Sequence, residues 1–251
     1  MNSKILKTAI FIIFGLIFIS GFSIESKADA KELGPNINVG DTVYYGNYEQ
    51  DGNKKNGKED ILWRVLDVNN GKALLISDKI IAFRKYNKED LNITWENSSI
   101  REWLNTKFVD TAFSDYEKNI LYRKYVVNDN NEEFGVSGGN DTKDSVFLLS
   151  IYEAENYFND YNDRIAYSTF YARKSYYMIY HRCGCSEARK KAMEGLNGDD
   201  FYWLRSPGAD RSMAAFVSNE GEIDSSSDAY HFYGWSVDWY LGVRPALWVY
   251  L

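Results

Sequence analysis

Three residues with affinity for soft metal ions lie within five positions of one another, at His181, Cys183 and Cys185. Thiolate and imidazole are ligands that zinc and copper(I) prefer, and His231, the other histidine of the chain, could complete the set. The two cysteines could instead form a strained local disulfide, join two chains, or stay as separate thiols. We favour these plainer roles and keep His181, Cys183 and Cys185 as candidate metal ligands.

An acidic segment, residues 128–144, offers the hard oxygen ligands that calcium binds. Its acidic and amide side chains include Asp129, Glu132, Glu133, Asn140, Asp141 and Asp144. The spacing does not match that of an EF-hand loop, and a solvated acidic loop explains the same composition. We therefore expect no cofactor unless it is Ca²⁺, for which Asn140, Asp141 and Asp144 are the candidate ligands.

A second polar segment, residues 225–240, is crowded with aromatic rings. The rings that we take as candidate ligand-binding residues are Tyr233, Trp235, Trp239 and Tyr240. Loops on a rigid scaffold are where binding residues gather, and aromatic anchors lose little rotamer entropy on contact. The alternative is a satellite core that pins the segment down. Other tryptophans lie in apolar strings and are predicted to be core: Trp63, Trp103, Trp203 and Trp248.

Catalytic signatures are weak. Ser206 precedes a proline and lacks the G-x-S-x-G context of a hydrolase nucleophile, and no pair of carboxylates stands out for glycoside hydrolysis. Arg205 and Arg244 lie at the ends of predicted strands, where a buried arginine needs carboxylate or carbonyl partners. We expect both arginines to be structural, with a ligand-reading pocket floor as the alternative.

Strand and turn patterns predict the elements that position these residues. Asn69-Asn70-Gly71 joins two apolar runs, 61–68 and 72–77, as a tight hairpin. Further elements are predicted as strands at 39–50, 146–149, 201–205, 214–218 and 242–251, and as a helix at 186–196.

Three Ser-x-x-Glu strings predict helix starts, because each serine can accept a hydrogen bond from a first-turn amide while the glutamate reaches back. They are Ser99 with Glu102, Ser114 with Glu117, and Ser150 with Glu153. Strands followed by helices and then by strands predict an α+β fold rather than a parallel α/β fold.

The first 30 residues are typical of a signal peptide. Lys4 and Lys7 precede a short apolar run, and Ala28-Asp29-Ala30 has the small-residue pattern of a cleavage site. The run is shorter than the roughly 20 residues that a membrane span needs. We expect cleavage after Ala30, no membrane span afterwards, and secretion to the extracellular space. Residues 31–38 would be a leader, and residues 39–251 one globular domain.

The net charge of the chain limits the classes of molecule that it is expected to bind. The whole chain carries a net charge of −7. Removing the predicted signal peptide leaves a charge near −8, because that segment holds three lysines against two acids. An acidic protein is a poor partner for nucleic acid or for an anionic membrane. Aromatic residues make up 16% of the chain, which is too much core material for a disordered protein.

Several short sequence strings are more specific than a pattern of polar and apolar residues, and together they indicate a protein family. They are Val43–Gln50, Trp63–Leu66, Ala73–Ser77, Trp95–Asn97 with Arg101–Asn105, Ser137–Thr142, Val146–Ser150, Trp203–Gly208 and Gly242–Leu247. In this order they resemble an uncharacterised family of Gram-positive bacteria, domain of unknown function 6273, over residues 39–251. The resemblance implies no function.

A second resemblance concerns two strings near the C-terminus, Trp203-Leu-Arg-Ser206 and Gly242-Val-Arg-Pro245. They are similar to the closing segment of the sulfatase-modifying (formylglycine-generating) proteins. This likeness implies a compact C-type-lectin-like domain with small antiparallel sheets, short helices and long loops. Those enzymes hold copper on a cysteine pair, but Cys183 and Cys185 are spaced too closely to match it, so no residue role is transferred.

These observations favour a secreted, non-enzymatic binding module that recognises a glycan or a protein at the cell surface. Export and loop aromatics support this interpretation, as does the absence of a clear catalytic motif. The alternative is an enzyme, either a thiol- or copper-dependent one related to the sulfatase-modifying factors or a hydrolase.

Overall fold

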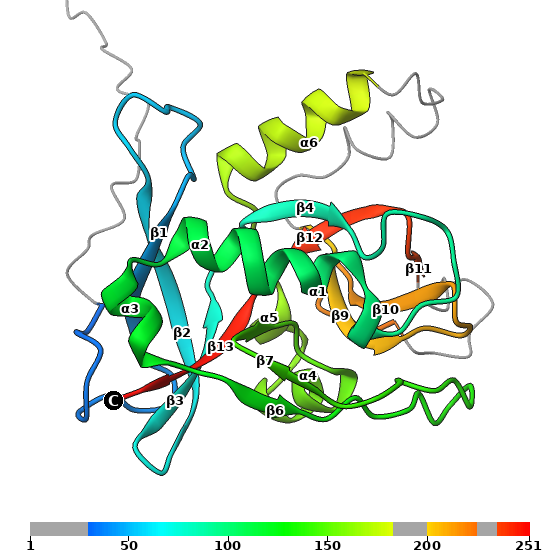
Figure 1. Cartoon of the computed structure of the whole chain (residues 1–251), viewed down its shortest axis with the longest axis horizontal. Coiled ribbons are helices and arrows are strands. Elements are labelled where there is room, and N and C mark those ends of the chain that lie inside the picture. Colours follow the sequence, from blue (N-terminus) through cyan, green and yellow to red (C-terminus); the bar gives the residue numbers. More distant parts are fainter. Residues whose placement is uncertain (1–29, 183–199, 225–234) are drawn as a thin grey trace, which may run out of the picture.

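A computed structural model of the chain describes residues 30–182, 200–224 and 235–251. The predicted helix at 186–196 and the body of the predicted signal peptide lie outside these ranges. The predicted α+β class is confirmed, because short helices pack against two sheets built mostly from antiparallel strands (Figure 1). None of the helices in the described ranges is long and apolar enough to span a bilayer.

The first sheet gathers strands from both ends of the domain, in the order β1-β2-β3-β13-β5, with β8 also paired to β13. Its strands are β1 (Thr42–Tyr48), β2 (Glu59–Asn69), β3 (Lys72–Ser77), β5 (Leu121–Tyr122), β8 (Val146–Phe147) and β13 (Ala246–Tyr250). The predicted hairpin between β2 and β3 is confirmed. Asn70 and Gly71 have φ values of 50° and 66°, the positive pair that a tight hairpin turn of this kind requires.

The second sheet has the order β11-β10-β9-β12-β4, with β4 at one edge. Its strands are β4 (Ala82–Lys85), β9 (Tyr202–Pro207), β10 (Met213–Val217), β11 (Trp235–Ser236) and β12 (Tyr240–Val243). Strands β9 and β12 run parallel, and the other pairs are antiparallel. A separate ribbon joins β6 (Lys124–Val126) to β7 (Thr142–Asp144).

The prediction of one strand over 242–251 is wrong. The chain forms β12, breaks at Arg244-Pro245, and continues as β13 in the other sheet. Proline has no N–H to donate to a ladder, while the carbonyl oxygen of Pro245 accepts a hydrogen bond from the Ser77 amide at 2.9 Å. The break therefore connects the two sheets.

Two of the three predicted helix caps are confirmed. Ser114 opens α3 (Asp115–Ile120) and Ser150 opens α4 (Ile151–Tyr157), each as a complete capping box. The third is wrong by one residue. The N-cap of α1 (Ser99–Trp103) is Ser98, which accepts from the Arg101 amide.

A neighbouring contact explains this shift. The Ser99 amide is already used, because it donates to Asn87 Oδ1 at 3.2 Å. Ser98 lies next to the short 3₁₀ turn Trp95–Asn97, and its hydroxyl donates to the carbonyl of Trp95. Glu102, the predicted box partner, is exposed.

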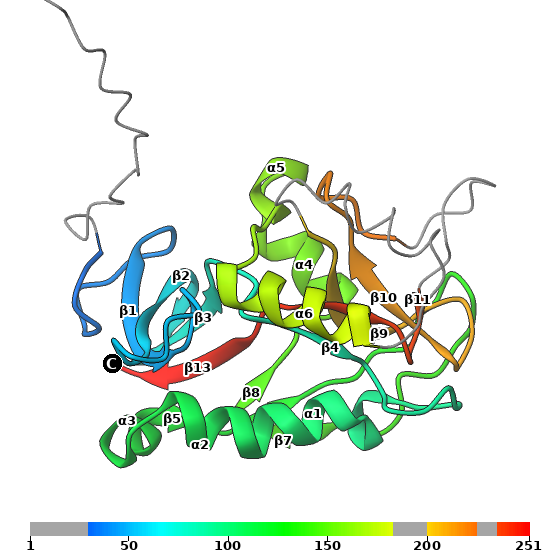
Figure 2. The same cartoon turned by 90° about the horizontal axis from the view of Figure 1, so that it is seen from above.

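A nearly continuous helical rod follows Ser98. It consists of α1, a π-helical segment (Leu104–Phe108) and α2 (Val109–Ala112), with α3 after it. The remaining helices are α5 (Tyr161–Arg164) and α6 (Phe170–Arg182). In both views the edge strand β4 lies between α6 and the rod (Figures 1 and 2).

The core fills the space between the sheets and the rod. The predicted core tryptophans are confirmed, because Trp63 and Trp203 are fully buried and Trp103 and Trp248 are nearly so. Residues 128–144, predicted as a long loop, contain the strand β7 and a bridge between Asn131 and Val136. The Asn131 side chain donates to the carbonyl of Pro207 at 3.0 Å, which ties the segment to β9.

Candidate functional site

The predicted thiol and imidazole ligands fall at the edge of the described ranges. His181 belongs to α6, whereas Cys183, Cys185 and His231 lie outside the described residues, as does Tyr233 among the aromatic candidates. The metal and thiol hypotheses for these residues stay predictions.

The three predicted calcium ligands have different surroundings. Asp144 is completely buried and its carboxylate accepts from Trp95 Nε1 at 2.9 Å, from Thr142 Oγ1 at 2.6 Å and from Arg101 Nε at 2.8 Å. Asp141 accepts from a backbone amide, and the Asn140 amide donates to Glu96. The Asp144 contacts fix the β6–β7 ribbon to α1, and a carboxylate with three donors has little capacity left for a cation.

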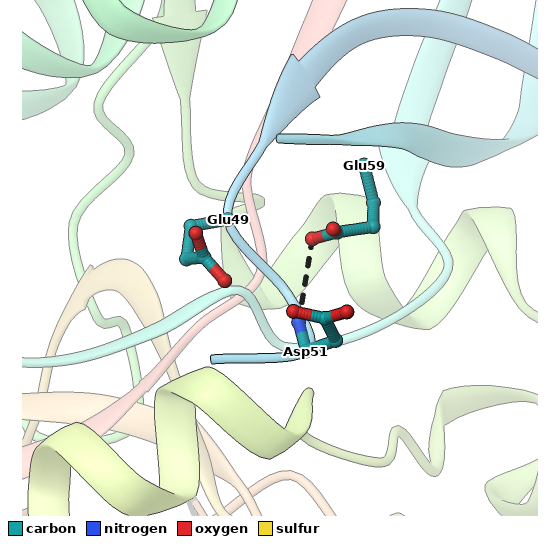
Figure 3. A group of neighbouring side chains, drawn as sticks. All are labelled: Glu49, Asp51 and Glu59. Atoms are coloured by element: carbon teal, nitrogen blue, oxygen red, sulfur yellow. Dashed lines mark hydrogen bonds between the residues drawn. The ribbon is translucent and has the colours of Figure 1, made fainter. Parts of the chain in front are cut away.

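A different acidic cluster forms where the loop between β1 and β2 begins and ends. The carboxylates of Glu49, Asp51 and Glu59 come within 4.8 Å of one another, and Figure 3 shows the three side chains gathered there. Each also accepts backbone hydrogen bonds of the loop: Glu59 from the Gln50 amide at 2.7 Å, and Glu49 from the Gly52 amide at 2.8 Å. These carboxylates stabilise the turn of the chain, and no further feature of the described residues points to a cation there.

The aromatic candidates separate into two places. Trp235 and Trp239 are half-buried and contact each other at 5.3 Å between ring centroids. Trp235 also packs against Phe201 and Phe216 on neighbouring strands. These two tryptophans thus extend the core at the β10–β11 edge of the sheet.

Tyr240 has a different environment at the opposite side of the sheet. Its ring faces Tyr176 of α6 at 6.1 Å and lies 5.8 Å from the Lys85 ammonium. Register explains the second contact, because Tyr240 of β12 pairs directly with Lys85 of the edge strand β4.

A cavity of about 180 Å³ lies at this place, between the edge strand and the helical rod. Its lining residues are Arg84, Lys85, Lys88, Ser99, Ile100, Glu102, Trp103, Thr106, Lys107 and Tyr240. We call it the β4–α1 groove; Figure 2 shows β4 and α1 side by side. It is the strongest candidate for a binding site among the described residues.

Arg84 is the most unusual residue of the β4–α1 groove. Side chains alternate along β4, so that Phe83 stacks on Tyr176 of α6 while the Arg84 guanidinium lies over the Trp103 ring, 3.9 Å from its centroid. No carboxylate of the described residues lies within ion-pair distance of it. Partial burial lowers the pKa of the guanidinium from its usual value, although arginine stays charged at neutral pH.

The charges around the groove have mostly one sign. Arg84, Lys85, Lys88 and Lys107 face a single lining carboxylate, that of Glu102. Lys85 is partly neutralised by Asp238, at 3.8 Å. The groove is positively charged although the whole chain carries a net charge of −7. A cleft lined by positive charges attracts negatively charged ligands. The groove therefore favours an anion.

The rod contributes a second unusual feature. Lys107 and Thr106 come from the π-helical segment, a form of helix that is rare and occurs often at functional sites. Sequence reasoning identified Tyr240 and placed Trp103 in the core, but it missed Arg84, Lys107 and the groove itself. The alternation around Arg84 could have indicated a strand, but nothing in the sequence shows that this strand faces α1.

Comparisons with known proteins place the chain in a family. Neither the comparison with curated proteins nor that with solved structures gives a match. Residues 70–251 match the family described as "Domain of unknown function (DUF6273)". Strands β1 and β2 lie wholly before the matched residues, although they belong to the same sheet as β3. Because the match covers most of its length, the chain belongs to the DUF6273 family.

Proposed function

We propose that the protein is a secreted, non-enzymatic binding module that recognises a glycan at the cell surface through the β4–α1 groove. The observation that carries this proposal is the lining of the groove. Tyr240 presents an aromatic ring beside cationic side chains, and the hydroxyls of Ser99 and Thr106 offer hydrogen bonds. Small-molecule sites typically combine an apolar wall with a few convergent polar groups.

Export and fold type belong to the same proposal. The signal-like N-terminus supports secretion, with processing after Ala30. Strands that join two small, mostly antiparallel sheets, with short helices around them, are compatible with a C-type-lectin-like relationship. In this proposal calcium is not needed at the groove, because its lining has one carboxylate, Glu102.

The proposal is tested by binding of the protein, collected from the medium of producing cells, to an array of glycans and to isolated cell-surface polysaccharide. We expect a subset of glycans to bind, and we expect Tyr240→Ala to weaken that binding by roughly tenfold, which corresponds to about 1.4 kcal/mol. Tyr116→Ala is the matched control, because Tyr116 is 79% exposed and is not one of the residues that line the groove.

Comparison of Tyr240→Ala with Tyr116→Ala distinguishes binding in the groove from binding elsewhere. Equal loss in both variants, or no loss in Tyr240→Ala, would contradict the groove as the site. Binding of a surface protein but of no glycan would replace the proposed ligand by a protein. The melting temperature of both variants is measured in parallel, so that a loss of fold is not taken for a loss of contact.

A further inference from the structure

The side chain of Arg84 is partly removed from water without the partners that usually accompany such a charge. Its Nε is buried and has no hydrogen-bond partner among the described residues. Its two Nη nitrogens make no hydrogen bond with the described residues and are not buried, so they are the part of the guanidinium that is open to the groove. Transfer of a charge out of water costs free energy unless a counter-charge or acceptors replace the water.

The contact with Trp103 offsets only part of this cost. A guanidinium over an aromatic ring contributes about 0.5–2 kcal/mol, depending on its exposure. The Trp103 ring packs against the guanidinium, with its centroid 3.9 Å from Arg84 Cζ, and so limits the movement of this group. A guanidinium fixed in this way loses little further freedom when an anion binds to its two free N–H groups.

The size of the cavity limits the ligand. A cavity of roughly 150 Å³ holds one benzene ring, and the groove measures about 180 Å³. One six-membered ring with a small substituent therefore fits. The Ser99 hydroxyl and the Glu102 carboxylate can bind ring hydroxyls, and the Thr106 oxygen can accept a further hydrogen bond while it donates to the Glu102 carbonyl. The Tyr240 ring lines the same cavity.

We infer that the β4–α1 groove binds a single anionic sugar residue, with its carboxylate or sulfate on the two Nη groups of Arg84 and its ring beside Tyr240. This inference rests on the proposed function and names the class of its ligand. The paired N–H groups of arginine match the two oxygens of a carboxylate and also two oxygens of a sulfate. Lys88 and Lys107 are exposed and add long-range attraction at the rim.

The experiment measures the dissociation constants of the full chain for glucuronic acid, its neutral methyl ester, glucose, and glucose 6-sulfate. We expect the acid or the sulfate, or both, to bind at least about tenfold more tightly than the neutral sugars, as for a charge-assisted bidentate contact. The comparison between the acid and the sulfate distinguishes the two sources of negative charge.

Three variants test whether the preference for an anionic sugar arises in the β4–α1 groove. Arg84→Gln should remove at least about tenfold of the affinity for the anionic sugar and leave the weak affinity for glucose unchanged. Lys107→Gln should weaken binding by roughly two- to fivefold, and less so at high salt. Lys55→Gln, which removes the same charge from an exposed site in the β1–β2 loop, should change nothing.

The outcomes distinguish this inference from the proposed function. Equal binding of glucuronic acid and its methyl ester by the unmodified protein would overturn the inference, and that arm needs no variant to fold. Arg84→Gln that binds the acid as tightly as the parent would overturn it as well. Glycan binding that depends on Tyr240 but not on negative charge would overturn the inference alone. Arg84-dependent binding of the monosaccharide without binding of any polymer would support the inference and contradict the glycan module.

Discussion

Arginines in two regions of this protein are held in opposite ways. Arg205, within β9, and Arg244, directly after β12, are almost completely buried. Arg205 pairs with Glu153 and donates to the carbonyls of Leu148 and Val127. In the β4–α1 groove, by contrast, Arg84 rests on a tryptophan ring and has no acceptor among the described residues.

Arg244 shows that the first arrangement does not depend on a carboxylate. Its guanidinium donates to the carbonyls of Ser77 and Arg164 and to the hydroxyl of Tyr202. Within the described part of the chain, each of the three arginines has one buried nitrogen without a hydrogen-bond partner, so that feature does not separate them. What separates them is that the interior arginines connect backbone segments, whereas the free N–H groups of Arg84 face a cavity. The first arrangement stabilises the fold, and the second is suited to a ligand.

The largest effect that tests this contrast is expected for Arg205→Ala. The change leaves Glu153 mostly buried without its partner and removes the donors to two carbonyls. Breaking a buried pair in this way costs about 3–5 kcal/mol. Urea denaturation of the parent and the variant measures the loss. A midpoint shift equivalent to less than about 1 kcal/mol would mean that Arg205 does not hold β9 against α4.

The role of the interior arginines could be predicted from the sequence, because the residue type and its place beside an apolar strand were enough to predict it. An arginine at the end of an apolar strand needs acceptors wherever the strand packs, and the expectation of carbonyl or carboxylate partners is confirmed for Arg205 and Arg244. The hairpin at Asn70-Gly71 and the caps at Ser114 and Ser150 were predictable for a similar reason. Each depends on neighbours within a few positions of the chain.

The groove was not predictable, because it depends on contacts far apart in sequence. Its lining comes from β4, from the rod at residues 99–107 and from Tyr240. The acidic segment shows the same limit on a smaller scale. Asp144 is buried and Lys143 is exposed because side chains alternate along β7. A three-residue strand inside a polar string gives no periodicity from which this alternation could be deduced.

A second test uses pH to probe the tyrosines that contact the interior arginines. The Tyr86 hydroxyl donates to the Arg205 carbonyl, and Tyr202 is bound by Arg244. Burial raises the pKa of both phenols above the ordinary 10.0, and burial raises that of Tyr157 to about 12. The folded protein therefore holds these protons more tightly than the unfolded chain does.

The sign of the effect follows from this difference. The stabilisation is fully present below about pH 10 and is lost as the pH rises through the folded-state values, from about 10 toward 12 and above. Urea midpoints at about pH 8, 9, 10 and 11 should be level at first and then fall, while tyrosinate absorbance appears only with unfolding for the buried fraction. Stability that stays constant to about pH 11 would contradict the role of these phenols.

The smallest effect on stability is expected for Arg84→Gln. A small effect is expected if Arg84 serves a ligand, and a large one if it is structural like Arg205 and Arg244. The variant loses the contact with Trp103, worth about 0.5–1 kcal/mol at an accessible site. It also no longer has to remove an unpaired charge from water, which offsets part of that loss. The free energy of unfolding, measured by urea beside Arg205→Ala, should therefore change by less than about 1 kcal/mol. A loss above about 2 kcal/mol would place Arg84 with the interior arginines as a structural residue, because a side chain kept for a ligand contributes little to the empty fold.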